Sequence, residues 1–251
     1  MLMLSKNVRR KLYEYVVDDL GLQIIKGDYL PGETLPNEDA LCKEFDVSRG
    51  VLREAMKVLI QKGLIESRPK TGTLIRPCSC WNVFDPDVLI WKYQTGNKLE
   101  FLRNIMEVRR IIEAEATKLT AERASAEDIE RIRSIHHEMA KTIMDGTRHP
   151  DEDVIVIDVK FHMAILDACG NELIVQIGHT MRQALVTARQ SDRYDLEAQK
   201  AVLPSHSMIL EAIAERDPVK AYNAAREHIE HVWRDMQKKV LTKTEAKQIF
   251  S

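Results

Sequence analysis

The segment from Leu35 to Ile75 constrains the fold more than any other part of this 251-residue chain. Its apolar spacing predicts two short helices joined by a tight turn, with Pro36 at the start of the first helix. Ser48 is a good N-cap for the second helix, and Gly63 is expected to end it. The runs 64–67 and 73–76 then flank Pro69-Lys70-Thr71-Gly72, which predicts a small β-hairpin.

The start of the second predicted helix has the chemistry of a DNA-reading element. Arg49 and Arg53 are four residues apart and therefore share a face, and arginine can grip guanine O6 and N7 with two hydrogen bonds. A helix N-terminus with a serine hydroxyl suits a phosphate, and the hairpin tip could follow the minor groove or backbone. The candidate DNA contacts are Ser48, Arg49, Arg53, Lys70, Thr71 and Gly72. The spacing alone equally fits a surface helix with two solvated arginines.

The remaining sequence predicts helices and no strands. One helix is expected over 6–26, and others near 86–95, 98–123, 126–145, 151–169, 171–191, 197–215 and 218–240. Between them, Trp81 and Phe84 are expected to dock on a domain from a connector. We therefore predict a DNA-binding head over 1–76, a linker and connecting helix over 77–92, an all-helical domain over 93–240, and a polar, frayed tail over 241–251.

The composition is typical of a cytoplasmic protein, and its net charge does not indicate nucleic-acid binding. Residues 1–76 carry 13 Lys+Arg and 11 Asp+Glu, or +2, and the rest carry 24 and 28, or −4, which sums to the net charge of −2. Any DNA affinity must therefore come from a local basic patch and two copies of the head. No apolar run reaches membrane-spanning length, and the four cysteines form neither a disulfide framework nor a CxxC pair.

Polar side chains interrupt the apolar stripes of several predicted helices in the second half. These inward residues are Arg109, Asp158, His162, His206 and His228. Inward charges are costly unless paired or bound to a metal, and an Asp-His-His-His set suits Zn, Ni or Mn. Arg109 is expected to clamp the carboxylate of an effector with its planar fork, whereas Glu113 falls toward a polar side.

Simpler interpretations of the same residues remain open. A DxxxH pair arises easily by chance in a chain with eight histidines, and Arg109 could instead pair with Asp158. His179 and His231 are possible substitutes as ligands. The neighbours of His136, His137 and His149 are polar, so these side chains are expected to be solvated.

The motifs also resemble a known family. The run PGETLPNEDALCKEFDVSRGVLREAMKVLIQKGLIESRPKTGTLI resembles the winged helix-turn-helix head of the GntR family of bacterial transcription regulators. WNVFDPDVLIW and EVRRIIEAEA resemble its FadR-type subgroup, which carries a helical FCD ligand-binding domain. The resemblance implies a mostly α fold, a winged head that contacts DNA, and metal ligands at Asp158, His162, His206 and His228. Asp39 stands where family members often have a DNA-contacting arginine, so no contact is carried over to it.

These observations predict a ligand-responsive, homodimeric regulator that reads a palindromic operator and represses a carboxylate or sugar-acid catabolic operon. The linker WNVFDPDVLIW resembles those of sugar-acid regulators. Two other functions remain open at this stage. The Asp/His site could belong to a metal-dependent hydrolase or isomerase, because open coordination positions can activate water. It could also belong to a metal sensor, in which the ion itself is the signal.

Overall fold

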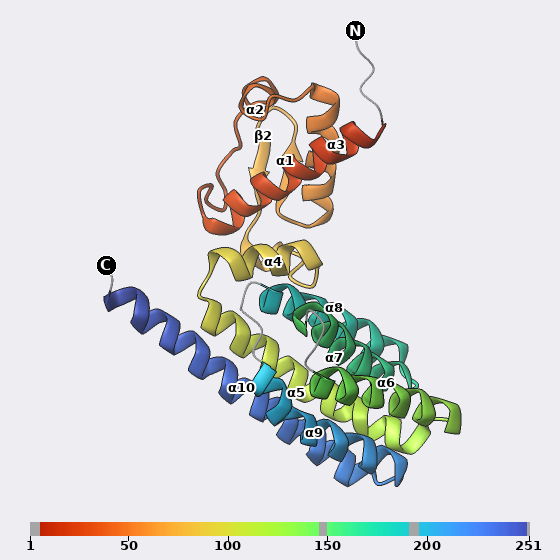
Figure 1. Cartoon of the computed structure of the whole chain (residues 1–251). Helices are drawn as coiled ribbons and strands as arrows, with labels where there is room; N and C mark the ends of the chain where they lie inside the picture. Colours follow the sequence, from red (N-terminus) through yellow and green to blue (C-terminus); the bar gives the residue numbers. More distant parts are fainter. Residues whose placement is uncertain (1–5, 146–149, 191–195, 250–251) are drawn as a thin grey trace. The chain divides into compact units, whose positions relative to one another are not determined.

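The computed structural model describes residues 6–145, 150–190 and 196–249 and divides the chain into two compact units, residues 1–98 and 99–251 (Figure 1). The first unit combines helices with one small hairpin, and in the second every described element is a helix. The predicted fold class is confirmed: a winged helix-turn-helix and an all-helical bundle in one mostly α chain.

The first unit is built around three helices and the hairpin. Its elements are α1 (Lys6–Lys26), α2 (Glu38–Glu44), α3 (Arg49–Gln61), β1 (Ile65–Arg68), β2 (Gly72–Ile75), the 3-10 helix η1 (Cys78–Cys80) and α4 (Pro86–Thr95). The strands pair antiparallel from Ile65 opposite Ile75 to Arg68 opposite Gly72. Apolar residues of α1, α2 and α3 share one core with the base of this hairpin, which fixes the hairpin beside the helices.

Local signals set the turn between α2 and α3. The Ser48 hydroxyl accepts a hydrogen bond from the Val51 amide at 3.4 Å, as expected for an N-cap. Asp46, in the turn, has a φ of +50°. The prediction for Pro36 is wrong, because Asn37 caps α2 through the Ala40 amide and Pro36 precedes that cap. The amide side chain of Asn37 satisfies a helix N–H, which proline cannot do.

The helix α4 packs against α1 within the first unit. Gly21 permits close approach, because a Cβ built there would lie 2.5 Å from the Trp91 ring. Lys62 follows α3 and binds the carboxylates of Asp85 and Asp87, each at 2.7 Å. Trp81 is buried as expected.

The expectation that Phe84 docks on a domain is wrong, because half of this side chain is exposed. The chain at this point is organised by the Asp85 N-cap and its ion pair with Lys62, neither of which requires the phenyl ring.

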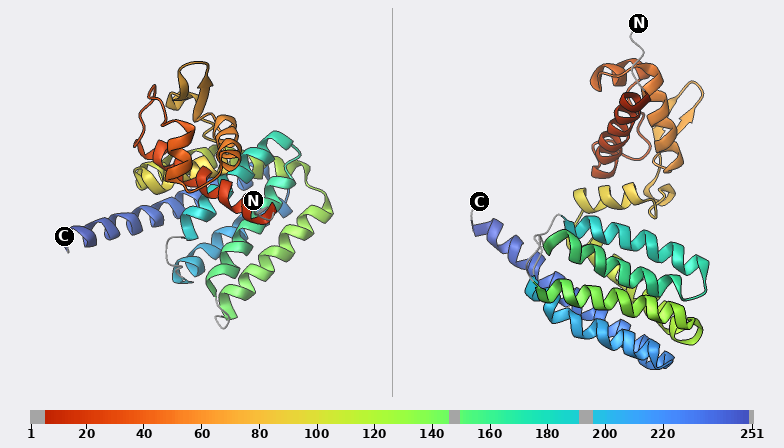
Figure 2. Two further views of the ribbon diagram at one scale, coloured as in Figure 1. Left: turned by 90° about the horizontal axis from the view of Figure 1, so that it is seen from above. Right: turned by 45° about the vertical axis from the view of Figure 1, so that its right-hand side comes forward.

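The second unit consists of helices that run alongside one another (Figure 2). They are α5 (Lys98–Arg123), α6 (Ala126–Asp145), α7 (Pro150–Asp167), α8 (Glu172–Gln190), α9 (Leu196–Ala214) and α10 (Pro218–Ile249). α6 packs against α7 and α9, α7 against α8, and α9 against α10. The polar tail predicted from residue 241 is wrong as a description of the backbone, because α10 continues to Ile249. After Pro218 at its start, the 32-residue helix contains no Gly or Pro that would end it.

Within the described residues, no helix combines the length and apolar character that crossing a membrane would require.

Substitution of Gly63 tests how closely the backbone after α3 packs against the backbone of η1. It has a φ of +77°, and a Cβ there would lie 2.3 Å from the Cys80 carbonyl oxygen, whereas Gly27 has a φ of +93° with nothing within 4 Å. Gly27→Ala should therefore cost only the left-handed backbone term, about 1 kcal/mol. Gly63→Ala should cost a further ~1–3 kcal/mol, because backbone must move. Calorimetric unfolding of the full chain measures both, and equal losses would contradict the steric account.

Candidate functional site

The predicted DNA-reading arginines lie at the exposed start of α3. The side chains of Arg49 and Arg53 are 66% and 64% exposed, so a duplex can reach them. Each is held by a carboxylate from α2. Arg49 Nη2 lies 2.8 Å from Asp39 Oδ1, and Arg53 Nη2 lies 3.2 Å from Glu38 Oε2. Exposed pairs of this kind are weak, so they orient the arginines without preventing them from moving to another acceptor.

The partners of these arginines were only partly visible in the sequence. No DNA contact was assigned to Asp39, and its pairing with Arg49, 10 residues later, was not predicted. Glu38 was missed altogether, although it lies next to Asp39 at the start of α2. The pairing depends on how α2 crosses α3, which spacing within either helix does not reveal.

The hairpin presents the other predicted contacts. Lys70 and Thr71 lie in the connection between β1 and β2, and Gly72 begins β2. All are exposed, with positive φ values of +66° at Lys70 and +94° at Gly72. The tip therefore offers an ammonium, a hydroxyl and exposed backbone at the end of a short two-stranded ribbon.

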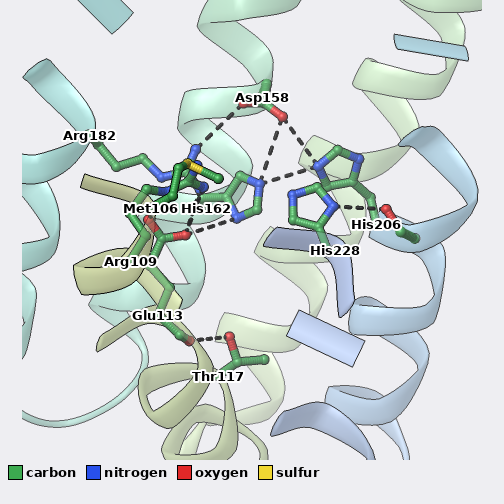
Figure 3. A network of polar contacts seen from close by, with 10 residues as sticks. Met106, Arg109, Glu113, Thr117, Asp158, His162, Arg182, His206 and His228 are labelled. Carbon is green, nitrogen blue, oxygen red and sulfur yellow. Dashed lines mark hydrogen bonds and ion pairs between the residues drawn. The ribbon is translucent and has the colours of Figure 1, made fainter. Parts of the chain in front are cut away.

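A second set of polar residues is buried inside the helical unit (Figure 3). Different helices supply them: Glu113 and Arg109 lie on α5, Asp158 and His162 on α7, and Arg182 on α8. His206 comes from α9 and His228 from α10. All are no more than 6% exposed, so the inward direction predicted for Arg109, Asp158 and the three histidines is observed.

The three imidazoles converge. Their nitrogens lie within 4.8 Å of one another, in the arrangement expected of ligands around a metal ion. His162 Nε2 and His206 Nε2 are 3.2 Å apart. The carboxylate of Asp158 lies 3.2 Å from His206 Nε2 and 3.7 Å from His162 Nε2. The structure thus brings together all four residues that the sequence predicted as metal ligands.

The protonation of this cluster suits metal binding. Burial, followed by the nearby charge of Arg182, holds the pKa of His162 well below its usual value. Burial, followed by His206, does the same to the pKa of His228. Burial opposes ionisation of Asp158, but its hydrogen bond with His206 and the charges of its neighbours keep its pKa well below 3.8. Metals require neutral imidazoles and ionised carboxylates, so the donor set fits a divalent ion.

Two buried arginines lie beside the cluster and share one glutamate. Arg109 Nε and Nη2 donate to the two oxygens of Glu113 at 2.6 and 3.1 Å. Arg182 donates from Nη2 to Glu113 at 2.7 Å and from Nη1 to Asp158 at 3.5 Å. Burial acts to raise the pKa of Glu113, but Arg109 and Arg182 hold it at about 2. Burial lowers the pKa of Arg182 to about 10, which leaves it charged at neutral pH.

These contacts correct two sequence expectations. Glu113 was placed toward a polar side, but it is buried and faces Arg109, four residues earlier on α5. The alternative pairing of Arg109 with Asp158 is wrong, because the direct partner of Arg109 is Glu113. Both predictions failed for the same reason. They took Arg109 as the one charged residue in an apolar stripe of α5, whereas the pair of Arg109 and Glu113 lies in that stripe.

Arg182 was missed. Its burial, next to Met181 on α8, is seen in the structure and was not indicated by the sequence pattern. Among the described residues, Arg182 Nε and His206 Nδ1 are buried polar atoms with no hydrogen-bond partner.

None of the other histidines that the structure describes belongs to this cluster. His179 contacts Asp167 at 3.0 Å, and His231 contacts Asp235 at 3.6 Å. The prediction for His136 is wrong, because its ring is half-buried and contacts Ser207 Oγ at 3.1 Å, although its sequence neighbours are polar. His137 is exposed as expected, and His149 lies outside the described residues.

Comparisons with known proteins identify the class. The model of the gntR family of bacterial regulatory proteins matches residues 12–75, and that of the FCD domain matches residues 104–231. The galactonate operon transcriptional repressor of Escherichia coli strain K12 is 30% identical over 214 residues, covering 84% of this chain and 90% of the relative. The Glc operon transcriptional activator of the same strain is 28% identical over 235 residues, covering 92% and 91%.

A solved structure of Lar, which controls the expression of the Listeria monocytogenes agr system, has the same fold, with a TM-score of 0.60 and 18% identity over 95% of this chain and 99% of that one. Fold and site together define a DNA-binding transcriptional regulator. The chain belongs to the GntR family and carries an FCD domain. The hydrolase or isomerase interpretation is therefore wrong, because these families are regulators and not enzymes.

The buried glutamate can be tested against a matched exposed one on the same helix. Glu113→Gln leaves two buried guanidinium groups with one carboxylate fewer, which should cost about 3–5 kcal/mol. Glu107→Gln removes only an exposed contact with Arg103 and should cost less than about 0.5 kcal/mol. Hydrogen exchange of α5 peptides measures both changes. Equal protection in the two variants would contradict the ion-pair account.

Proposed function

We propose that this protein is a ligand-controlled regulator whose effector, a small carboxylate, binds beside a divalent metal ion in the helical unit and alters operator binding. Asp158, His162, His206 and His228 would hold the ion. Zinc suits these ligands best, and nickel or manganese are the alternatives. When bound, the ion would attract and orient carboxylate or hydroxyl oxygens of the effector.

The observation that carries this proposal is the charge balance of the buried residues. Among the described residues of this network, Arg109 and Arg182 contribute two positive charges, and Glu113 and Asp158 contribute two negative charges, which sum to zero. A divalent ion among the histidines would leave an excess of +2 inside the bundle. Because isolated buried charge is costly, the loaded site would favour an anion. A small acid satisfies that requirement.

The two arginines would supply the remaining contacts. The fork of Arg109 is filled by Glu113, and among the described residues its Nη1 contacts the sulfur of Met106 at 3.4 Å, a weak acceptor. Arg182 Nε is buried with no hydrogen-bond partner in the described part of the chain. An acid oxygen would satisfy these N–H groups. We therefore extend the proposed effector contacts from Arg109 to include Arg182.

The head would read DNA as one half of a homodimer. Ser48, Arg49 and Arg53 would contact bases and phosphate from α3, while Lys70, Thr71 and Gly72 would follow the backbone or minor groove. Two heads related by a two-fold axis would match a palindromic operator. Asp39 and Glu38 would hold the arginines in the free protein and give way to DNA acceptors.

The regulated genes would belong to a sugar-acid or related carboxylate pathway, and regulation would be by repression. Similarity to the galactonate operon repressor supports both statements. The similar Glc operon protein is an activator, so the sign of regulation needs its own test.

One experiment distinguishes regulation by an acid from regulation by the metal ion itself. An operator selected from random duplexes is titrated with metal-stripped and zinc-loaded protein, each with galactonate, other sugar acids, hydroxy acids and dicarboxylates. We expect an acid to lower operator affinity about 5–150-fold only when the metal is present. A change caused by zinc without any acid would instead assign a metal sensor. Unchanged binding in every combination would contradict effector control.

The role of Arg49 can be measured directly. Arg49→Ala should cost on the order of 1–3 kcal/mol of operator binding and relax the base preference at one position. Arg133→Ala removes an equally charged, exposed arginine from the helical unit and should change neither. Binding selections on both variants provide the comparison. An Arg49→Ala protein with the affinity and preference of the parent would remove Arg49 from the interface.

The role of His206 can be separated from that of a surface histidine. His206→Ala should lower bound metal and acid response together, because one proposed ligand is lost, while metal-free operator binding persists. His137→Ala removes an exposed imidazole outside the cluster and should retain both properties. Elemental analysis and operator titration measure these effects. A full metal complement in His206→Ala would refute the proposed ligand role.

A further inference from the structure

A serine hydroxyl contacts one of the two ring nitrogens of His228. Ser205 Oγ lies 2.8 Å from His228 Nδ1. The same hydroxyl lies 2.6 Å from the carbonyl oxygen of Val202, one turn earlier on α9. His228 is only 1% exposed, so water has little access to compete for its ring nitrogens.

The donor and acceptor roles of these groups determine which nitrogen of His228 carries the proton. A carbonyl oxygen only accepts, so the single hydroxyl proton of Ser205 must be donated to Val202. The serine oxygen must then accept, and His228 Nδ1 must be the donor. An imidazole that binds a metal is neutral and carries one N–H, which is here on Nδ1. Nε2 is therefore left with its lone pair.

His228 is one of the three imidazoles whose possible ligand atoms lie within 4.8 Å of one another. The His228 ring lies 4.4 Å from the His206 ring and 5.0 Å from the His162 ring, centroid to centroid. Figure 3 shows His228 beside His206 and His162, with Asp158 above them. The neutral tautomer set by Ser205 is thus the one that offers Nε2 to an ion held among these rings.

We propose that Ser205 is a positioning residue for the metal site, which fixes His228 as the Nδ1–H tautomer and presents its Nε2 as a ligand. The inference rests on the proposed metal site and adds a residue that touches no ion. One short stretch of α9 would then serve two ligands, because His206 follows Ser205 directly and His228, on α10, donates its Nδ1–H to Ser205. Partners of this kind hold ligating histidines in place, and their loss typically lowers metal affinity 10–100-fold.

The chain supplies a matched control two residues further along the same helix. Ser207 Oγ contacts His136 Nε2 at 3.1 Å and the Leu203 carbonyl at 3.5 Å. This serine–histidine pair resembles the first, but His136 is not among the three converging imidazoles. A general effect of removing a serine from α9 would appear in both variants, whereas an effect on the metal site would appear only at Ser205.

The experiment uses the full chain in metal-free form, and it reads tautomers before any metal is added. Long-range ¹H–¹⁵N spectra of histidine-labelled protein, with the His228 signal assigned by its loss in His228→Gln, should show protonation at Nδ1. Ser205→Ala should shift this signal toward the Nε2–H form, Ser205→Thr should restore it, and Ser207→Ala should leave it unchanged. A His228 signal that is indifferent to Ser205→Ala would overturn the proposal.

Zinc titration of the same proteins then tests the consequence. Ser205→Ala should bind zinc about 10–100-fold more weakly than the parent, while Ser205→Thr and Ser207→Ala should bind like the parent. Equal zinc binding by Ser205→Ala and the parent would overturn the role of Ser205 alone. Absence of zinc binding by the parent chain would instead overturn the proposed metal site, so the two failures are distinguishable.

Discussion

The buried ion network of Glu113, Arg109 and Arg182 is the constraint on which the helical unit depends. Glu113 neutralises guanidinium groups from two helices, and Arg182 extends the network to Asp158 on a third. Without this compensation, burying these charges would cost several kcal/mol each. Through Asp158 the same network reaches α7, which carries His162, and contacts His206 on α9. The same buried charged residues therefore hold helices together and form the proposed effector site. A bundle stabilised by apolar packing alone would not require buried charges.

Most of the helical architecture and the four converging residues could be predicted from the sequence, because periodicity reports which way a side chain points. The stripes identified Asp158, His162, His206 and His228 as inward, and each is buried. The partners were not predictable in the same way. Arg182 contacts Glu113 across 69 residues and Arg49 contacts Asp39 across 10, so both pairs depend on how helices cross. The inward position of Glu113 could have been predicted, because it lies four residues after Arg109 and therefore on the same face of α5.

The head and the helical unit use charged residues in opposite ways. On α2 and α3 the arginine–carboxylate pairs are exposed, hence weak, and the arginines can move to other acceptors. In the bundle the corresponding pairs are buried, hence costly to break. This contrast suits a regulator in which the DNA contacts must form and dissolve repeatedly, while the effector site must stay organised between binding events. Control then requires the effector to bind the free and DNA-bound forms unequally.

The central claim is that the buried imidazoles hold a metal ion. X-ray absorption at the zinc edge of the full-length, zinc-loaded chain tests it most directly, because scattering from imidazole rings is distinct from that of water and carboxylate. The account predicts one zinc per chain, with three imidazole nitrogens and oxygen donors bound to it. A spectrum without imidazole scattering, or with sulfur ligands from the exposed Cys78 and Cys80, would contradict it.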